Sequence, residues 1–99
     1  MAPYTIEEIK RIITPIAMEH GVKSVSLFGS YSNGTASVGS DIDLKIEKGK
    51  LRSLFQLCGF RLAVEDALKI PVDLVTSESS DLDFLELISK DEVLLYRTP

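Results

Sequence analysis

Residues 28–44, F-G-S-Y-S-N-G-T-A-S-V-G-S-D-I-D-L, contain the features that decide the fold of this 99-residue chain. The run begins at the end of an apolar segment, continues through residues rich in Gly, Ser, Asn and Thr, and ends in a strict alternation of aspartate with apolar residues. Val22 to Phe28 is typical of a strand, 29–40 of a loop with one short helical turn, and Asp41 to Ile46 of a second strand. The sequence therefore predicts two strands joined by a polar, glycine-containing loop.

A helix is expected before the first strand. Thr5 and Glu8 have the spacing of a capping box, in which each side chain satisfies a free backbone donor of the other. Apolar residues recur at helical spacing up to Gly21, which is a suitable C-cap. Pro15 removes one hydrogen bond of this helix, so we expect a kink or a break there.

The second half of the chain predicts a long helix, a strand, a short helix and a final strand. Residues 51–68 are expected to form a helix whose apolar stripe faces the core, made of Leu51, Leu54, Phe55, Cys58 and Leu62. Val72 to Val75 is expected to be a buried strand, 77–80 a turn, Asp83 to Ser89 a helix, and Val93 to Tyr96 a strand or extended tail. This order predicts an α/β (α+β) fold in which helices cover a small mixed β-sheet.

Length and composition indicate one globular domain covering residues 1–99, with 44% hydrophobic and 26% charged residues. The net charge of −4 argues against a domain that neutralises phosphates along a nucleic acid, so no direct nucleic-acid contact is expected. No apolar run approaches the roughly 20 residues that span a bilayer, and the N-terminus lacks the pattern of a signal peptide. With a single cysteine as well, we expect a cytoplasmic protein that does not contact membranes.

Three aspartates indicate a metal site. On a strand, Asp41 and Asp43 would project to the same face about 6.6 Å apart, where two like charges repel each other unless a cation lies between them. Mg²⁺ prefers such carboxylate oxygens. Asp73 lies in the predicted buried strand, where an unpaired charge is costly. If the two strands are neighbours, three carboxylates can hold two metal ions for a displacement at phosphorus, and Asp73 could also act as a general base.

The loop before these acids has the character of a phosphate cradle. Gly29 allows a triphosphate to approach the backbone, Ser30 offers an N–H and a hydroxyl at the start of a helical turn, and Gly34 lets the loop close. Such a loop leading into an acidic pair is a coherent phosphoryl-transfer site. Simpler readings remain open: the Asp41–Asp43 pair on a solvated strand edge, Asp73 in a structural role, and Ser30 as a turn cap.

These motifs resemble the signature of the DNA polymerase β-like nucleotidyltransferases, which is a GS pair, a loop glycine and an S-D-x-D-L segment. The short chain, together with P-V-D-L-V at 71–75, is similar to the minimal nucleotidyltransferase (MNT) subfamily. The resemblance implies a nucleotide-binding set of Gly29, Ser30, Gly34 and Ser40. It also implies that two Mg²⁺ ions and a catalytic centre are formed by Asp41, Asp43 and Asp73, with ATP as substrate.

The resemblance further implies a protein partner. Such proteins are often encoded beside a HEPN-domain RNase toxin, and attach AMP to one of its tyrosines, which makes them protein adenylyltransferases and antitoxins. Asn33 and Ser37 stand where members commonly carry arginines, which weakens a direct grip on the triphosphate. A second hypothesis is therefore a catalytically weak or inactive interaction module that neutralises a partner by binding it. The helix expected at 83–89 is apolar on more than one side, which leaves surface for a partner or for a homo-oligomer.

Overall fold

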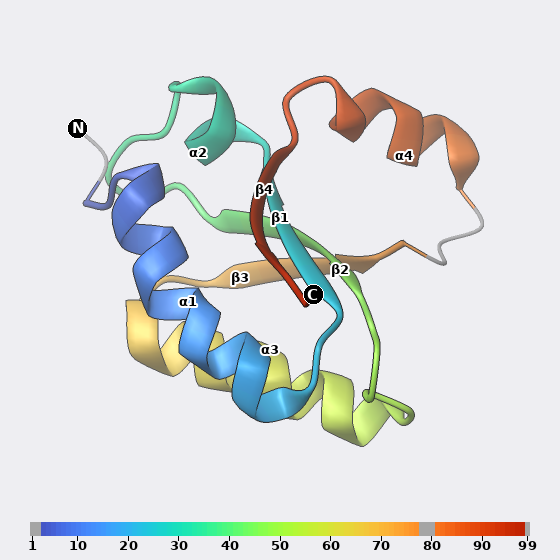
Figure 1. The fold of residues 1–99 in the computed structure, drawn as a ribbon. Coiled ribbons are helices and arrows are strands. Elements are labelled where there is room, and N and C mark those ends of the chain that lie inside the picture. Colours follow the sequence, from blue (N-terminus) through green and yellow to red (C-terminus); the bar gives the residue numbers. More distant parts are fainter. Residues whose placement is uncertain (1–2, 78–80, 99) are drawn as a thin grey trace.

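The computed structural model describes residues 3–77 and 81–98. Its elements, in chain order, are α1 (Ile6–His20), β1 (Ser24–Phe28), α2 (Ser30–Asn33), β2 (Ile42–Glu47), α3 (Leu54–Leu68), β3 (Val72–Thr76), α4 (Leu82–Ser89) and β4 (Val93–Arg97). Figure 1 shows that α1 and α3 lie together along one face of the sheet, whereas α4 lies on its other side. The predicted fold class is confirmed. The predicted turn at 77–80 lies mostly outside the described residues. None of the helices in the described ranges is both long enough and apolar enough to span a membrane.

The four strands form one mixed sheet in the order β3-β2-β1-β4. β1 is antiparallel to both β2 and β4, and β2 is parallel to β3. A parallel pair needs a long crossover, which α3 provides between β2 and β3. β1 and β2 are therefore the inner strands, and β3 and β4 are the edges.

The alternation in β2 separates the two faces of the sheet. Its apolar residues are completely buried beneath the helices, namely Ile42, Leu44 and Ile46. The residues between them are half-buried on the opposite side, which we call the open face: Asp43, Lys45 and Glu47. The β1 residues that pair with these three share that face, and all five residues of β1 are buried because the strand is internal. The sheet thus has an apolar side, buried under the helices, that stabilises the fold, and a polar side that can carry a functional site.

α1 begins as its capping box predicts. The Glu8 N–H donates to the Thr5 hydroxyl at 3.1 Å, and the Thr5 N–H donates to the Glu8 carboxylate at 2.9 Å. The expectation of a break at Pro15 is wrong, because α1 continues through it. Pro15 is exposed, whereas Ile13 and Ala17 on either side of it are completely buried. Their packing holds the helix together across the missing hydrogen bond.

α3 buries the opposite side of the helix to the one predicted. The helix starts later than expected, after Ser53, whose hydroxyl accepts from the Gln56 N–H at 3.1 Å. Its core-facing residues are Phe60, Val64 and Leu68. Within the predicted stripe, Leu51 is buried ahead of the helix, but the side chains on α3 itself face solvent: Leu54, Phe55, Cys58 and Leu62. The helix carries apolar residues on two sides, and only the sheet determines which side is buried.

Candidate active site

Asp43 and Asp73 lie next to each other on the open face. β2 and β3 pair in parallel register with Asp43 opposite Asp73, and neighbouring strands are about 4.8 Å apart. The Asp73 carboxyl is close enough to help raise the pKa of Asp43, so the two groups interact directly. Asp41 lies just before β2 rather than on it, and is exposed. The sheet therefore brings together two of the three predicted acids, with the third beside them.

The electrostatics of this pair favour a bound cation. The pKa of Asp43 is raised from an ordinary value of 3.8 to about 6, mainly by burial and then by the neighbouring Asp73 and Asp41. A divalent cation between the acids would remove this penalty, so the oxygen donors present fit Mg²⁺. Within residues 3–77 and 81–98, no three His, Cys, Asp or Glu side chains are close enough to hold a metal ion. As the side chains stand, Asp41 is near the Asp43–Asp73 pair but not close enough for the three to hold one metal ion together.

Asp73 is exposed, and the expectation of a buried strand around it is wrong. β3 forms an edge of the sheet, with β2 as its neighbour on one side. Within β3 only Val72 is buried, and the residues that follow Asp73 are half-buried. Solvent can therefore reach Asp73 from the outer side of the sheet. An apolar strand sequence does not reveal an edge position, which depends on strand order.

Gly29 places the loop directly against Asp43. Its φ of 75° lies in the left-handed region, which favours glycine. A Cβ atom at this position would collide with the carboxylate of Asp43. The carbonyl of Gly29 then accepts from the N–H groups of Ser32 and Asn33, each at 3.1 Å, which begins α2 as predicted. Gly34 ends α2 with a φ of 83°.

The polar side chains of the loop mostly hold the loop itself. The Ser40 hydroxyl accepts from the Ser37 N–H at 3.0 Å, and the Ser40 N–H donates to the Ser37 carbonyl at 3.0 Å. The side-chain oxygen Oδ1 of Asn33 accepts from the N–H of Thr35 at 3.1 Å and from its hydroxyl at 2.6 Å. Ser30 is the first residue of α2, where helix N–H groups lack an intrahelical acceptor. Asn33 thus stabilises a turn where a loop arginine would offer a charge.

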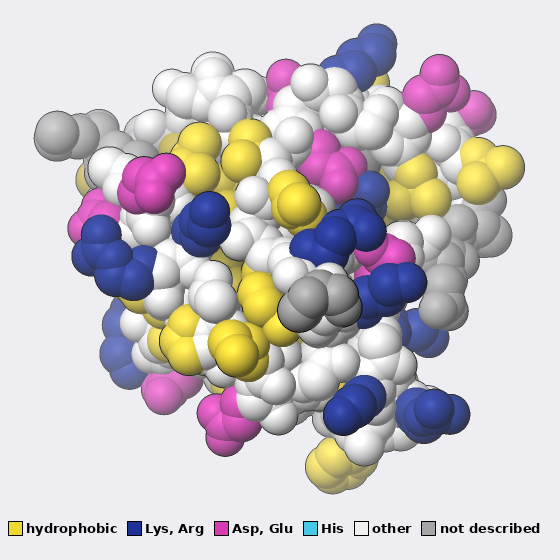
Figure 2. Space-filling model, in the orientation of Figure 1, with side chains coloured by type: hydrophobic (Ala, Val, Ile, Leu, Met, Phe, Trp, Pro, Cys, Tyr) yellow, Lys and Arg dark blue, Asp and Glu magenta, His cyan; other side chains and the backbone are white. Residues whose placement is uncertain are grey.

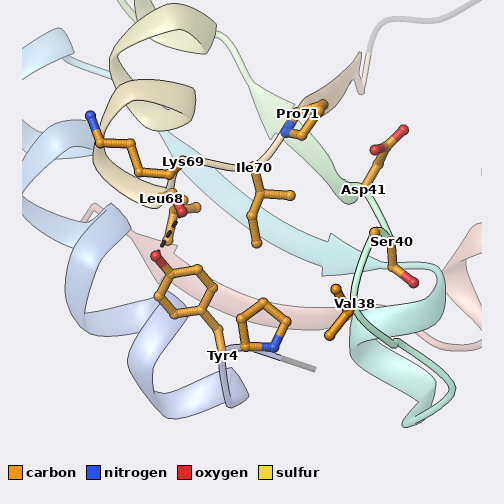
Figure 3. Close-up of a pocket in the computed structure, with 10 residues that line it drawn as sticks. Tyr4, Val38, Ser40, Asp41, Leu68, Lys69, Ile70 and Pro71 are labelled. Carbon is orange, nitrogen blue, oxygen red and sulfur yellow. Dashed lines mark hydrogen bonds between the residues drawn. The ribbon is translucent and has the colours of Figure 1, made fainter. Parts of the chain in front are cut away.

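Two hollows flank the loop. The larger has a volume of about 580 Å³. It is lined by Ser40 and Asp41 on one side and by the connection from α3 to β3 on the other (Figure 3). Tyr4 closes one side of it, and its hydroxyl donates to the Leu68 carbonyl at 2.6 Å. The other, of about 390 Å³, adjoins Gly29 and is lined by Phe28, Gly29, Leu87, Lys90 and Asp91. Lys90 therefore brings a cation beside Gly29, at the start of the loop.

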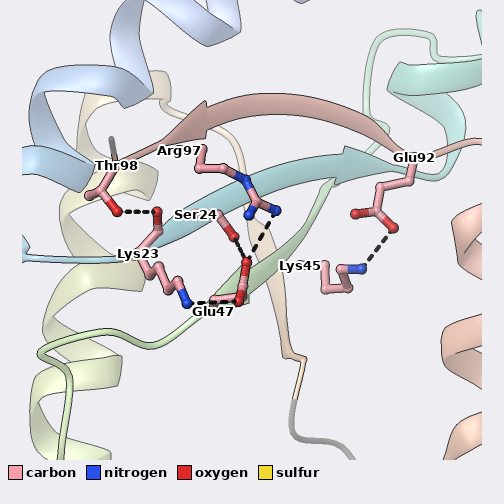
Figure 4. Close-up of polar contacts among 7 residues, drawn as sticks. All are labelled: Lys23, Ser24, Lys45, Glu47, Glu92, Arg97 and Thr98. Atoms are coloured by element: carbon pink, nitrogen blue, oxygen red, sulfur yellow. Dashed lines mark hydrogen bonds and ion pairs between the residues drawn. The ribbon is translucent and has the colours of Figure 1, made fainter.

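Ion pairs lie on the open face further along β2 from Asp43. Lys45 lies two residues further along β2, and its ammonium contacts the Glu92 carboxylate at 2.8 Å (Figure 4). Glu47 accepts from the Ser24 hydroxyl at 2.7 Å and contacts Arg97 at 3.4 Å. Figure 2 shows accordingly that Lys and Arg side chains lie among Asp and Glu on the side in view.

Sequence reasoning missed Lys90 and Glu92 as members of this surface. Both follow α4 in a segment with no motif, and they reach the site because β4 returns to pair with β1. The alternation of β2 does place Lys45 on the face of Asp43, which was the available signal for that residue.

Comparisons with known proteins identify the family. The profile of the polymerase beta nucleotidyltransferase family matches residues 10–99. The chain is 39% identical over 89 residues to "Putative protein adenylyltransferase MJ0435" of Methanocaldococcus jannaschii, a match covering 90% of each chain. It is 35% identical over 83 residues to protein adenylyltransferase MntA of Thermococcus cleftensis, covering 80% of this chain and 84% of the relative.

Solved structures share the fold at lower identity. A chain described as a "putative minimal nucleotidyltransferase" matches with a TM-score of 0.77 and 24% identity, over 94% of this chain and 98% of that one. A crystal structure of a toxin–antitoxin with AMP-PNP matches with a TM-score of 0.77 and 24% identity, over 90% and 73%. A structure of tri-AMPylated Shewanella oneidensis HEPN toxin in complex with MNT antitoxin matches with a TM-score of 0.72 and 20% identity, over 95% of this chain and 74% of that one. From the family profile and the two relatives, this chain belongs to the polymerase beta nucleotidyltransferase family.

Proposed function

We propose that this protein transfers AMP from ATP to a hydroxyl group of a partner protein and releases pyrophosphate, with Mg²⁺ as cofactor. The observation that carries the proposal is the contact of Gly29 with Asp43, because it joins a phosphate loop and an acidic pair in one site. Relatives above 30% identity are named as protein adenylyltransferases, which supports this reaction. Because the reaction consumes ATP, we place it in the cytoplasm.

Each predicted site residue has a role in this proposal. Asp41, Asp43 and Asp73 would hold two Mg²⁺ ions, which supply positive charge to the triphosphate. The N–H groups of Ser30 and Tyr31, together with the Ser30 hydroxyl, would bind its outer phosphates, because the first N–H groups of a helix have no intrahelical acceptor. Gly34 and Ser40 would keep the loop in the shape that presents those donors.

Asp73 would then serve as the general base. The acceptor hydroxyl gives its proton to the Asp73 carboxylate, and its oxygen forms a bond to the α-phosphorus. The bond from that phosphorus to the oxygen bridging to the β-phosphate breaks, and pyrophosphate leaves. The exposure of Asp73 on an edge strand supports a macromolecular acceptor, because a large molecule can approach from that side.

We infer that the acceptor is a tyrosine of a HEPN-type toxin, so that the protein acts as an antitoxin. The structural relatives include an MNT antitoxin in complex with an AMPylated HEPN toxin, which supports this choice. The resemblance of the motifs at Gly29–Ser30 and Ser40–Leu44 to the MNT subfamily supports the same choice.

The test is incubation of the protein with ATP labelled at the α-phosphate, Mg²⁺ and a purified HEPN-type toxin. We expect label on the HEPN protein with the wild type and with the exposed control Asp83→Asn, and none with the double variant Asp41→Asn/Asp43→Asn. Equal labelling by the double variant would disprove the assigned site.

Asn33 supports a second candidate, an interaction module that silences its partner by binding. Its side chain is engaged with Thr35, so the loop does not offer the charge that a triphosphate would use. The two functions differ in a nucleotide-free assay of the toxin's RNase activity. A binding module inhibits without ATP, and the Asp41→Asn/Asp43→Asn variant inhibits equally well. A transferase requires ATP and loses inhibition in that variant.

A further inference from the structure

The side of α3 that faces away from the sheet is an exposed apolar surface. Leu54 is 75% exposed, Phe55 91% and Leu62 55%. Together with Cys58 and Gly59, these residues line a mainly apolar hollow of about 440 Å³. We call these five residues the α3 outer face.

The proposed transfer reaction does not explain this surface. α3 packs on the helical side of the sheet, whereas Asp43 lies on the open face. The α3 outer face is also contiguous along one helix, unlike scattered surface leucines, which need no explanation. A clustered apolar surface of this kind is typical of a protein–protein interface.

We propose that the α3 outer face binds the same face of a second copy of this chain, with the two α3 helices antiparallel about a twofold axis. The axis would pass between Cys58 and Gly59. Phe55 of one copy then lies against Leu62 of the other, and the reverse contact follows by symmetry. The face is thus complementary to itself.

Gly59 permits the close approach that this arrangement needs. A Cβ atom built at Gly59 would meet nothing within 4 Å, so open space lies above the backbone at the middle of the face. Packed helices approach to about 8–10 Å between axes, with smaller side chains allowing the shorter distances. A glycine at the crossing point lets Phe55 and Leu62 of the two copies interlock on either side.

Charges at the two ends of α3 select the antiparallel orientation. Arg52 is exposed just before the helix, whereas Asp66 is exposed near its end, beside the half-buried Glu65. An antiparallel pair places Arg52 of each copy near Asp66 of the other, whereas Glu65 already accepts from Arg61 at 3.1 Å and from the Val72 N–H at 2.8 Å. A parallel pair would bring like charges together. Asp66 also contacts Lys69 at 3.2 Å, but such an exposed pair is weak and can be exchanged.

The interface is small, which determines the affinity to expect. One pair of 15-residue helices buries less than the roughly 800 Å² per partner of a standard interface. We therefore expect a dissociation constant that is roughly micromolar or weaker, so that dimers form at high concentration. Both open faces stay accessible in this dimer, and the proposal does not depend on the proposed function.

The experiment measures self-association of the purified chain by sedimentation equilibrium over a wide concentration range, with circular dichroism to verify folding. The wild type should associate, and Phe55→Glu and Leu62→Glu should each weaken association at least tenfold. Leu82→Glu is the matched control, because Leu82 is 73% exposed but lies on α4, and it should leave association unchanged. A wild type that stays monomeric at millimolar concentration would overturn the proposal, as would a Phe55→Glu variant that associates normally.

Three further variants test the geometry. Arg52→Glu should weaken the dimer, and Arg52→Glu/Asp66→Arg should restore it, because the exchanged charges again face each other. Cys58 is the only cysteine in the chain, so a short bismaleimide should cross-link two folded copies through it, and Cys58→Ser should prevent this. If a monomeric wild type instead loses HEPN binding through Phe55→Glu, the face serves a different protein and the dimer is ruled out.

Discussion

At the scale of single residues, Gly29 is the position where the loop after β1 meets Asp43. Gly29→Ala adds a side chain in the left-handed region and a collision with Asp43. We expect it to cost about 1–3 kcal/mol of stability and to lower AMP transfer roughly 100-fold, because one of the two groups must move. Gly34→Ala is the matched control: its φ of 83° gives similar strain, but a Cβ there meets nothing within 4 Å. Thermal melts and transfer rates of both variants should separate the collision from the strain, and equal losses of activity would contradict this account.

Asp43 should destabilise the metal-free protein at neutral pH. Its pKa in the folded state is about 6, above the ordinary 3.8, so the folded state holds the proton more tightly than the unfolded chain does. Protonated Asp43 therefore costs the folded state nothing below about pH 4. As the pH rises through 6 the group ionises, and the folded state is destabilised relative to the unfolded chain. After discounting for solvent screening of a half-buried group, Asp43→Asn should raise the free energy of unfolding by about 1 kcal/mol at pH 7.5. Urea denaturation in EDTA should show this gain disappear near pH 4, and a less stable variant at pH 7.5 would contradict it.

Lys90 should contribute to nucleotide binding, since it lines the hollow beside Gly29. Lys90→Ala should raise the KM for ATP severalfold and change kcat little, because the residue lies beside the loop and not at the acid pair. Lys10→Ala, an exposed lysine on α1, is the control. An unchanged KM in steady-state transfer assays would remove Lys90 from the site.

The face of Asp43 and the turn at Gly29 could be predicted from sequence because their geometry is local, whereas Asp41 lies before β2 and not on it. Asp43 and its neighbours depend on the two-residue period of a strand, and the turn at Gly29 depends on its own backbone. The exposure of Asp73 could not be predicted, because it follows from the place of β3 at the sheet edge. Lys90 enters the site through a long-range return of the chain, which leaves no local pattern.

At the scale of elements, the two sides of α3 should differ strongly in their effect on stability. Phe60 is completely buried, so Phe60→Ala should cost about 3–5 kcal/mol through lost contacts and a cavity. Phe55 is 91% exposed, so Phe55→Ala should change the stability of the monomer by less than about 0.5 kcal/mol. Urea denaturation at low protein concentration measures both. Comparable losses in the two variants would mean that the predicted stripe faces the core after all.

α1 and α3 show which features of an element the sequence can reveal. The start of α1 follows from the capping box at Thr5, which involves only neighbouring residues. The orientation of α3 does not follow from its period, because the set around Phe55 and the set around Phe60 both recur at helical spacing. The exposed set was the wrong choice, since the β2-α3-β3 crossover presses the other set against the sheet.

At the scale of the whole molecule, nucleotide binding should stabilise the fold. A ligand that binds only the folded state adds about 2.7 kcal/mol at a hundredfold excess over its Kd. For a domain of this size, 1 kcal/mol corresponds to about 4–8 °C, so AMP-PNP with Mg²⁺ should raise the Tm by roughly 10 °C or more. Asp41→Asn/Asp43→Asn should abolish the shift in differential scanning fluorimetry. A shift that survives in this variant would indicate a nucleotide site elsewhere.

The mixed sheet and its helical cover were predictable for the whole chain, whereas the strand order was not. Four strand segments and three helices are compatible with several sheets, and long-range pairing selects among them. The order β3-β2-β1-β4 places the two acid-bearing strands side by side and leaves one of them at an edge.

The crossover through α3 also fixes when the protein can become active during its own synthesis. Gly29 and Asp43 meet across the antiparallel pair of β1 and β2, which closes a short loop at little entropic cost. Asp73 joins them only after the whole of α3 has left the ribosome and docked, and β4 later still. A nascent chain would thus hold the loop and Asp43 together before it holds Asp73. In the proposed mechanism Asp73 is the base, so we expect a chain that lacks β3 to be catalytically silent.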